Sequence, residues 1–120
     1  MKPAGLRPQA KQDRLAEIRH YRDVAGTRVA ETLVLATELA LDLLERQPSI
    51  GSPTLGQQIG APTLRSWRVA GFPLMWFYIE RDDHLDIIRL LGERQDVLAI
   101  LASEGPLSAH EPEAPYRSAP

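Results

Sequence analysis

The basic side chains of this 120-residue chain are almost all arginine, and several lie close together in its second half. Twelve of the fourteen Lys and Arg residues are Arg. The planar guanidinium of Arg recognises carboxylates, phosphates and protein surfaces with more defined geometry than the ammonium of Lys. Recognition of an anion or a partner is therefore the first chemistry to consider, although biased gene base composition produces the same excess. Five of these residues lie between residues 64 and 101: Arg65, Arg68, Arg81, Arg89 and Arg94.

Side chains that do other chemistry are scarce. The chain has no Cys, which excludes disulfides and thiolate chemistry and is typical of a cytosolic protein. Three scattered histidines (His20, His84 and His110) without any Cys do not predict a transition-metal site. A net charge of −2 excludes a globally basic nucleic-acid binder. We therefore expect no metal, no cofactor and no direct contact with nucleic acid.

The elements that must position these residues begin with two predicted helices. Apolar residues recur at spacings of three and four over Gln9–Ala25 and again over Arg28–Gln47. Gly26 interrupts the pattern, and Thr27 stands where it can cap the second helix, so an antiparallel helical hairpin is predicted. The second helix has an apolar stripe made of Ala30, Leu33, Val34, Thr37, Leu41 and Leu44. Other apolar residues widen this side beyond what one packing neighbour requires: Val29, Ala36, Leu39, Ala40 and Leu43.

The second half of the chain predicts a strand meander. Residues 48–62 are rich in Gly, Pro and Ser and are expected to form a loop. Leu64–Val69 alternates as a strand, whereas Leu74–Ile79 is apolar on both sides, which is typical of a central strand covered on two faces. Leu85–Leu91 is the third strand, and Gln95–Leu101 supports a short final helix.

Residues 1–101 are predicted to form a single domain, and residues 102–120 a flexible Pro-rich tail. The sequence around residues 4–7 fits either a short edge strand or an arm. No run is long and apolar enough to span a membrane, and the polar N-terminus lacks the apolar centre of a signal peptide. We therefore expect a cytoplasmic protein. Its predicted fold is α+β: an N-terminal helical hairpin packed on a small antiparallel β-sheet, with a short C-terminal helix.

This order of elements resembles the ParE/RelE superfamily of bacterial toxins from type II toxin–antitoxin systems, from Ala10 to Leu101. In the helices the resemblance rests on Leu15-Ala16-Glu17-Ile18 with Tyr21, and on Leu43-Leu44-Glu45-Arg46-Gln47-Pro48-Ser49-Ile50-Gly51. In the strands it rests on Leu64-Arg65, on the Gly71-Phe72-Pro73 turn with the aromatic strand through Tyr78, and on Ile87-Ile88-Arg89-Leu90-Leu91 followed by Arg94 and Asp96.

The RelE-like branch of the superfamily cleaves messenger RNA on the ribosome, and this sequence supplies that chemistry poorly. Cleavage by the RNA 2′-hydroxyl requires a general base, a general acid and cations that stabilise the phosphate charge. Pro73-Leu74-Met75 stands where RelE-like toxins often carry an Arg, and no Tyr or His follows Arg94 before the tail. The available cations would be Arg65, Arg68, Arg89 and Arg94, with Tyr78, His84 or Glu93 as proton carriers.

The Gly-Phe-Pro turn and the ending from Arg94 to Leu101 resemble the ParE-like branch instead. This resemblance implies a toxin without catalytic residues, which poisons DNA gyrase and is held inactive by a ParD-like antitoxin in a hetero-oligomer. ParE-like sequences usually show His-Gly-x-Arg-Asp after the last strand. Here the segment is Leu91-Gly92-Glu93-Arg94-Gln95-Asp96, without the His and with Gln95 between the Arg and the Asp. A member without present toxicity is therefore a third alternative.

Candidate contacts with the antitoxin or the target are Arg65, Trp67, Arg68, Arg89, Glu93, Arg94 and Asp96. Structural roles are the alternative for several of them. Arg65 could pair with a helix carboxylate such as Glu17, Trp67 could belong to the core, and the last three could form an ion-pair and capping cluster at the final helix. The partner is expected to cover the hairpin and sheet with an acidic, amphipathic C-terminal region.

Overall fold

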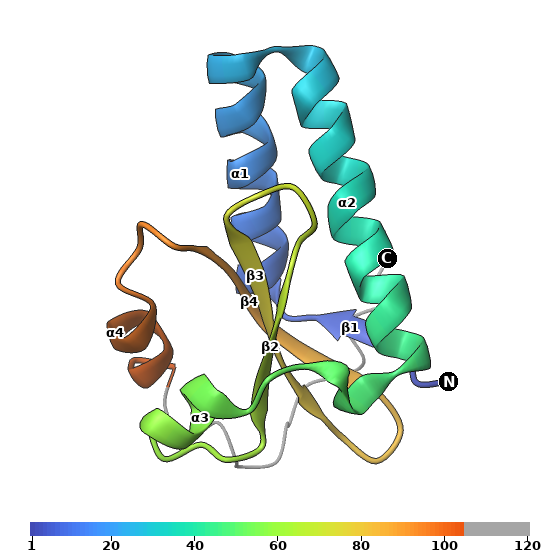
Figure 1. The fold of residues 1–120 in the computed structure, drawn as a ribbon, viewed down its shortest axis with the longest axis vertical. Coiled ribbons are helices and arrows are strands. Elements are labelled where there is room, and N and C mark those ends of the chain that lie inside the picture. The colour runs from blue at the N-terminus through green and yellow to red at the C-terminus, as the bar shows by residue number, and fades with distance from the viewer. Residues whose placement is uncertain (105–120) are drawn as a thin grey trace.

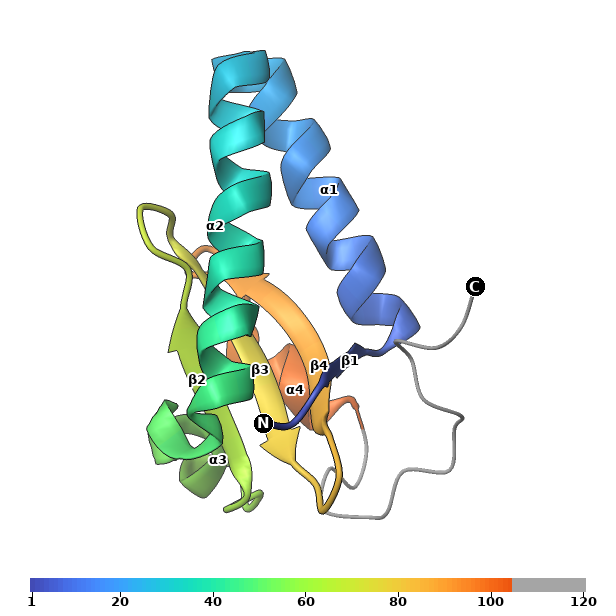
Figure 2. The same cartoon turned by 90° about the vertical axis from the view of Figure 1, so that its right-hand side faces the viewer.

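The computed structural model describes residues 1–104 and confirms the predicted α+β class. A helical hairpin leans on one face of a four-stranded sheet, and two short helices lie on the other face (Figures 1 and 2). The elements in chain order are β1 (Ala4–Leu6), α1 (Pro8–Ala25), α2 (Thr27–Arg46), the 3₁₀ helix η1 (Pro48–Ile50), α3 (Thr54–Gln58), β2 (Leu64–Arg68), β3 (Leu74–Glu80), β4 (Leu85–Gly92) and α4 (Val97–Ala102).

The helical hairpin forms as the periodicity predicts. Pro8 stands in the first turn of α1, where its missing N–H costs nothing. The tight link is made by Gly26, whose φ of +96° is readily available only to glycine. Thr27 is the first residue of α2 and not its cap, so that prediction was wrong. Within residues 1–104, no side chain caps the N-terminus of this helix. The tip of the hairpin projects beyond the sheet (Figure 1).

The sheet has the strand order β1-β4-β3-β2. The β2–β3–β4 meander is antiparallel, as expected from the sequence. Residues 4–6 form an edge strand and not an arm, and this strand pairs in parallel with β4, with Ala4 opposite Leu85 and Leu6 opposite Ile87. The N-terminal strand therefore turns an antiparallel meander into a mixed sheet.

The central strand β3 is covered on both faces, which confirms the interpretation of its uninterrupted apolar sequence. Trp76 and Tyr78 face the helical hairpin and pack in one cluster with Leu33 and Leu44 of α2. Phe77 and the residues on its side of the sheet pack in a second cluster, together with side chains from α3 and α4. The indole N–H of Trp76 donates to the carbonyl oxygen of Thr37 at 3.3 Å, which fixes α2 to the strand.

Residues 48–62, predicted to be loop, contain the two short helices η1 and α3, so that prediction was wrong in part. The backbone of Gly56 lies so close to the next strand that an added Cβ would approach the carbonyl oxygens of Ala61 and Leu64. Packing of this kind, not helical periodicity, holds the five residues of α3 in place. Helix α4 begins and ends one or two residues later than predicted, and the predicted tail from residue 105 onward lies outside the described residues.

Candidate functional site

The candidate residues from the sequence are spread over the two ends of β2, the middle of β4 and the segment that follows β4. Arg65, at the start of β2, donates from Nη1 to the carbonyl oxygens of Gly51 at 2.7 Å and Ser49 at 3.2 Å. The expected pairing with Glu17 is therefore wrong. Arg65 instead satisfies the carbonyl oxygens of the tight corner between α2 and α3.

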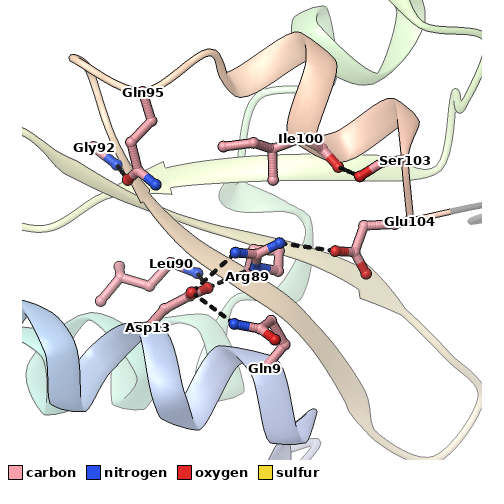
Figure 3. Close-up of polar contacts among 9 residues, drawn as sticks. All are labelled: Gln9, Asp13, Arg89, Leu90, Gly92, Gln95, Ile100, Ser103 and Glu104. Carbon is pink, nitrogen blue, oxygen red and sulfur yellow. Dashed lines mark hydrogen bonds and ion pairs between the residues drawn. The ribbon is translucent and has the colours of Figure 1, made fainter.

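Arg89, in the middle of β4, is held from two sides (Figure 3). Its guanidinium bonds the carboxylate of Asp13 on α1 at 2.7 and 3.0 Å, and that of Glu104 beyond α4 at 2.9 Å. Asp13 also accepts the backbone N–H of Leu90, an edge donor of β4 that β1 does not reach. The hydrogen bond from Asp13 is the main reason that the pKa of Arg89 is raised. With 13% of its side chain exposed, Arg89 is occupied inside the fold.

Four other candidates lie at the end of β2 and in the segment that follows β4. Arg68 and Glu93 form an ion pair at 2.8 Å, and both side chains are more than half exposed. Arg94 is also exposed and makes no ion pair within residues 1–104. Asp96 caps α4 by accepting the N–H of Ala99 at 3.2 Å, as the sequence predicted for this residue. Gln95 supports the turn by accepting the N–H of Gly92 at 2.7 Å.

A small notch lies beside this turn. It is a cavity of about 90 Å³ between α1 and the segment after β4. Burial is the main reason that the pKa of Glu17 in this notch is raised above its ordinary value, against the lowering effects of His20 and Arg94. Sequence reasoning placed Glu17 in a family segment but gave no sign that it faces Arg94. The residues that line the notch are Glu17, Tyr21, Pro73, Leu74, Gly92, Glu93, Arg94 and Gln95.

An apolar groove with a volume of about 550 Å³ lies between α2 and the end of β2. Leu35 and Leu39 on α2 are 61% and 66% exposed, which is unusual for two neighbouring leucines on one helix face. Trp67 forms part of the opposite wall and is half-buried against the core. The groove is lined by Thr32, Leu35, Ala36, Leu39, Ala40, Leu43, Trp67, Arg68 and Ala70.

The residues considered for RNA cleavage do not assemble. Tyr78 is fully buried, and its hydroxyl accepts the N–H of Gly51 at 3.0 Å and donates to the carbonyl oxygen of Pro48 at 2.6 Å. Burial raises the pKa of Tyr78, which further opposes a role in proton transfer. His84 lies in the β3–β4 turn, at the opposite end of β4 from Arg94. Tyr78 lies opposite Arg65 on the neighbouring strand, but its hydroxyl is held by the backbone. Glu93 lies beside Arg68 and is paired with it.

Two further properties concern the whole described region. Residues 1–104 contain no cluster of His, Asp and Glu side chains suited to holding a metal ion. Within the same range, no helix has both the length and the apolar character needed to cross a membrane.

Comparisons with known proteins agree with this geometry. A chain from "Chromosomal ParDE TA system from P. aeruginosa" has a similar fold, with a TM-score of 0.65 and 18% sequence identity over 77% of this chain and 96% of that chain. No curated protein sequence matches. The family model described as "ParE toxin of type II toxin-antitoxin system, parDE" matches residues 5–97, which is most of the chain. On this match, the chain belongs to the ParE toxin family.

Proposed function

We propose that this protein is a toxin that acts by binding other proteins, that a ParD-like antitoxin neutralises it, and that DNA gyrase is its target. The observation that carries the antitoxin part is the open groove along α2. Apolar surface of this kind is normally buried when a partner is bound. The similar fold comes from a ParDE system, and the chain itself belongs to the ParE family. A cytoplasmic location follows from the proposed target.

The charges around the groove indicate what kind of segment would fill it. Residues seven apart share a helix face, so Arg28 and Arg46 stand on the same side of α2 as Leu35 and Leu39, one at each end of the pair. Arg68 lies across the groove. An amphipathic helix with an apolar stripe and acidic flanks would bury the leucines and place its carboxylates beside these cations.

Gyrase as the target rests on the family. Action by binding, without catalysis, is supported by the contacts of three candidate catalytic residues. Arg65, Arg89 and Tyr78 all form hydrogen bonds that hold the fold together, so they are not available for catalysis. The RelE-like alternative, a ribosome-dependent endoribonuclease, has less support, because its proton carriers Tyr78 and His84 lie away from Arg68 and Arg94.

The target is tested by inducing the chain in a bacterial host and following nucleic acids. A DNA-damage response and filamentation with intact messenger RNA would support gyrase poisoning. Codon-phased cuts in messenger RNA would establish the RelE-like alternative. Growth without any defect at good expression would show a member that has lost its toxicity.

The antitoxin part is tested with a ParD-like protein, which the proposal expects to be encoded in the neighbouring reading frame. Leu39→Glu places a charge in the groove and should weaken the complex by at least about a hundredfold, since an apolar anchor is lost and a carboxylate is buried. Val24→Glu makes a similar change at the exposed hairpin tip and should leave affinity unchanged. Equal affinities of the two variants in calorimetry would show that the groove is not the binding surface.

A further inference from the structure

We propose that the notch between α1 and the Gly92–Gln95 turn receives a single basic side chain, Lys or Arg, of the same antitoxin that fills the groove. This inference rests on the proposed function, because it concerns the partner named there. The proposal adds a second contact with the antitoxin. The groove would bind an acidic amphipathic segment, whereas the notch would bind one basic side chain.

Glu17 differs from the other carboxylates that are withdrawn from water. Among residues 1–104, the Asp and Glu side chains that are not exposed are Asp13, Glu17, Glu45, Asp86 and Glu104. Asp13 and Glu104 bind Arg89, Asp86 binds Arg7 and Arg81, and Glu45 accepts the N–H of Ala4. Glu17 alone in this group has no hydrogen bond or ion pair within the described chain. A partly desolvated carboxylate without a donor is unfavourable, so a donor from outside would stabilise it.

The size of the notch limits what this donor can be. Water occupies about 30 Å³ in the liquid, so a cavity of 90 Å³ is larger than one water molecule needs. Small-molecule sites are several times larger, with volumes of about 300–1,000 Å³. The head group of one long side chain is of the right scale. Tyr21, Pro73 and Leu74 provide apolar walls for the methylene groups that precede a Lys or Arg head group.

The charges around Glu17 decide between a cation and an anion. Asp13 and His20 are its neighbours on α1, and Arg94 and Glu93 face it from the segment after β4. Glu93 is already paired with Arg68. Arg94 is exposed, so solvent weakens its field, and burial still outweighs its effect on Glu17. The carboxylate therefore lacks compensation, and a charge-assisted hydrogen bond would provide it.

The notch and the groove are adjacent, so one partner can reach both. Arg68 lines the groove, Glu93 lines the notch, and the two side chains are joined at 2.8 Å. Both cavities also border the segment that links β2 to β3, through Ala70 on one side and Pro73 on the other. A basic anchor at this distance from the apolar contact would fix the register of the antitoxin and discriminate against antitoxins that lack it.

The test measures binding of the adjacent ParD-like protein to the full chain by calorimetry. Glu17→Gln removes the charge and keeps the shape, and should weaken the complex about tenfold, which is about 1.4 kcal/mol. Asp82→Asn removes the same charge in the β3–β4 turn, far from both cavities, and should have no effect. Arg94→Gln should raise the affinity, because it removes a cation that competes for Glu17. The ¹³C resonance of the Glu17 carboxyl should also titrate at lower pH in the complex than in the free chain.

Two outcomes would overturn the inference. If Glu17→Gln binds as tightly as the wild type while Leu39→Glu does not, the groove is the antitoxin site and Glu17 is merely hydrated. If Arg94→Gln weakens the complex and Glu17→Gln does not, the notch binds an anionic group of the antitoxin instead of a cation. Loss of the proposed function has a different signature, in which wild type and all variants, Leu39→Glu included, fail to bind.

Discussion

Arg89 joins three segments that are far apart in the sequence, namely α1, β4 and the residue that follows α4. Replacing it with Ala would leave Asp13 and Glu104 as largely buried carboxylates without a cation. We expect Arg89→Ala to lower the free energy of unfolding by about 2 kcal/mol or more in urea titrations. Arg68→Ala is the matched control, since its ion pair with Glu93 is exposed and should contribute less than about 1 kcal/mol. Similar losses for the two variants would contradict a structural role for Arg89.

Glu17 makes the stability of the fold depend on pH in an unusual direction for a carboxylate. Because burial raises its pKa in the folded chain, the proton is held more tightly there than in the unfolded chain. Its contribution to stability is therefore complete below the ordinary pKa of 4.5 and is lost as pH rises through the raised value. At pH 7, Glu17→Gln should therefore be slightly more stable than wild type in urea unfolding, by no more than about 0.5 kcal/mol, because Glu17 is only partly buried and solvent screens its charge. Near pH 3 the two proteins should be equally stable. A variant that is less stable at pH 7 would show an attractive partner for Glu17 inside the fold.

At the scale of elements, Tyr78 ties the sheet to the corner between α2 and α3. Its hydroxyl bonds two backbone groups, the N–H of Gly51 and the carbonyl oxygen of Pro48. Tyr78→Phe leaves both groups unsatisfied and should cost about 1–3 kcal/mol of unfolding free energy. Tyr21→Phe is the comparison, because the Tyr21 hydroxyl has no hydrogen bond within residues 1–104, and its stability should stay close to that of wild type. Equal stabilities in thermal unfolding would argue against this corner as an anchor.

The elements that could be predicted are those whose signal is local. The helical hairpin follows from periodicity interrupted at Gly26, and β3 from an apolar run that is buried on both faces. The short helix α3 was missed because its five residues are held by close contact of Gly56 with Ala61 and Leu64. The parallel pairing of β1 was missed because three residues carry little signal and their partner lies about eighty residues away.

The site was predicted less well than the fold, for a related reason. The residue types were found, and so was the broad apolar side of α2 that forms the groove. The sequence does not show which charged side chains form ion pairs within the fold. Arg89 is paired with Asp13 and Glu104, whereas Glu17 has no partner within residues 1–104, and both facts depend on segments that meet only after folding.

At the scale of the whole molecule, the open groove predicts the behaviour of the isolated chain. With Leu35 and Leu39 exposed, the purified protein should self-associate in sedimentation velocity as its concentration rises. The double change Leu35→Glu and Leu39→Glu should keep it monomeric while leaving the unfolding free energy within about 0.5 kcal/mol of wild type, since neither side chain is in the core. If the double variant still self-associates, the surface responsible for self-association is not the groove.

The pairing of β1 with β4 has a consequence for synthesis. Residues 4–6 leave the ribosome about eighty residues before the strand they join, Leu85–Gly92, so the sheet cannot be completed until almost the whole described chain has been made. A nascent chain that stops before this strand lacks the middle of the sheet, the Arg89 ion pairs and the notch. The notch can therefore form only after the segment that follows β4 has been made, whereas the residues that line the groove are made earlier.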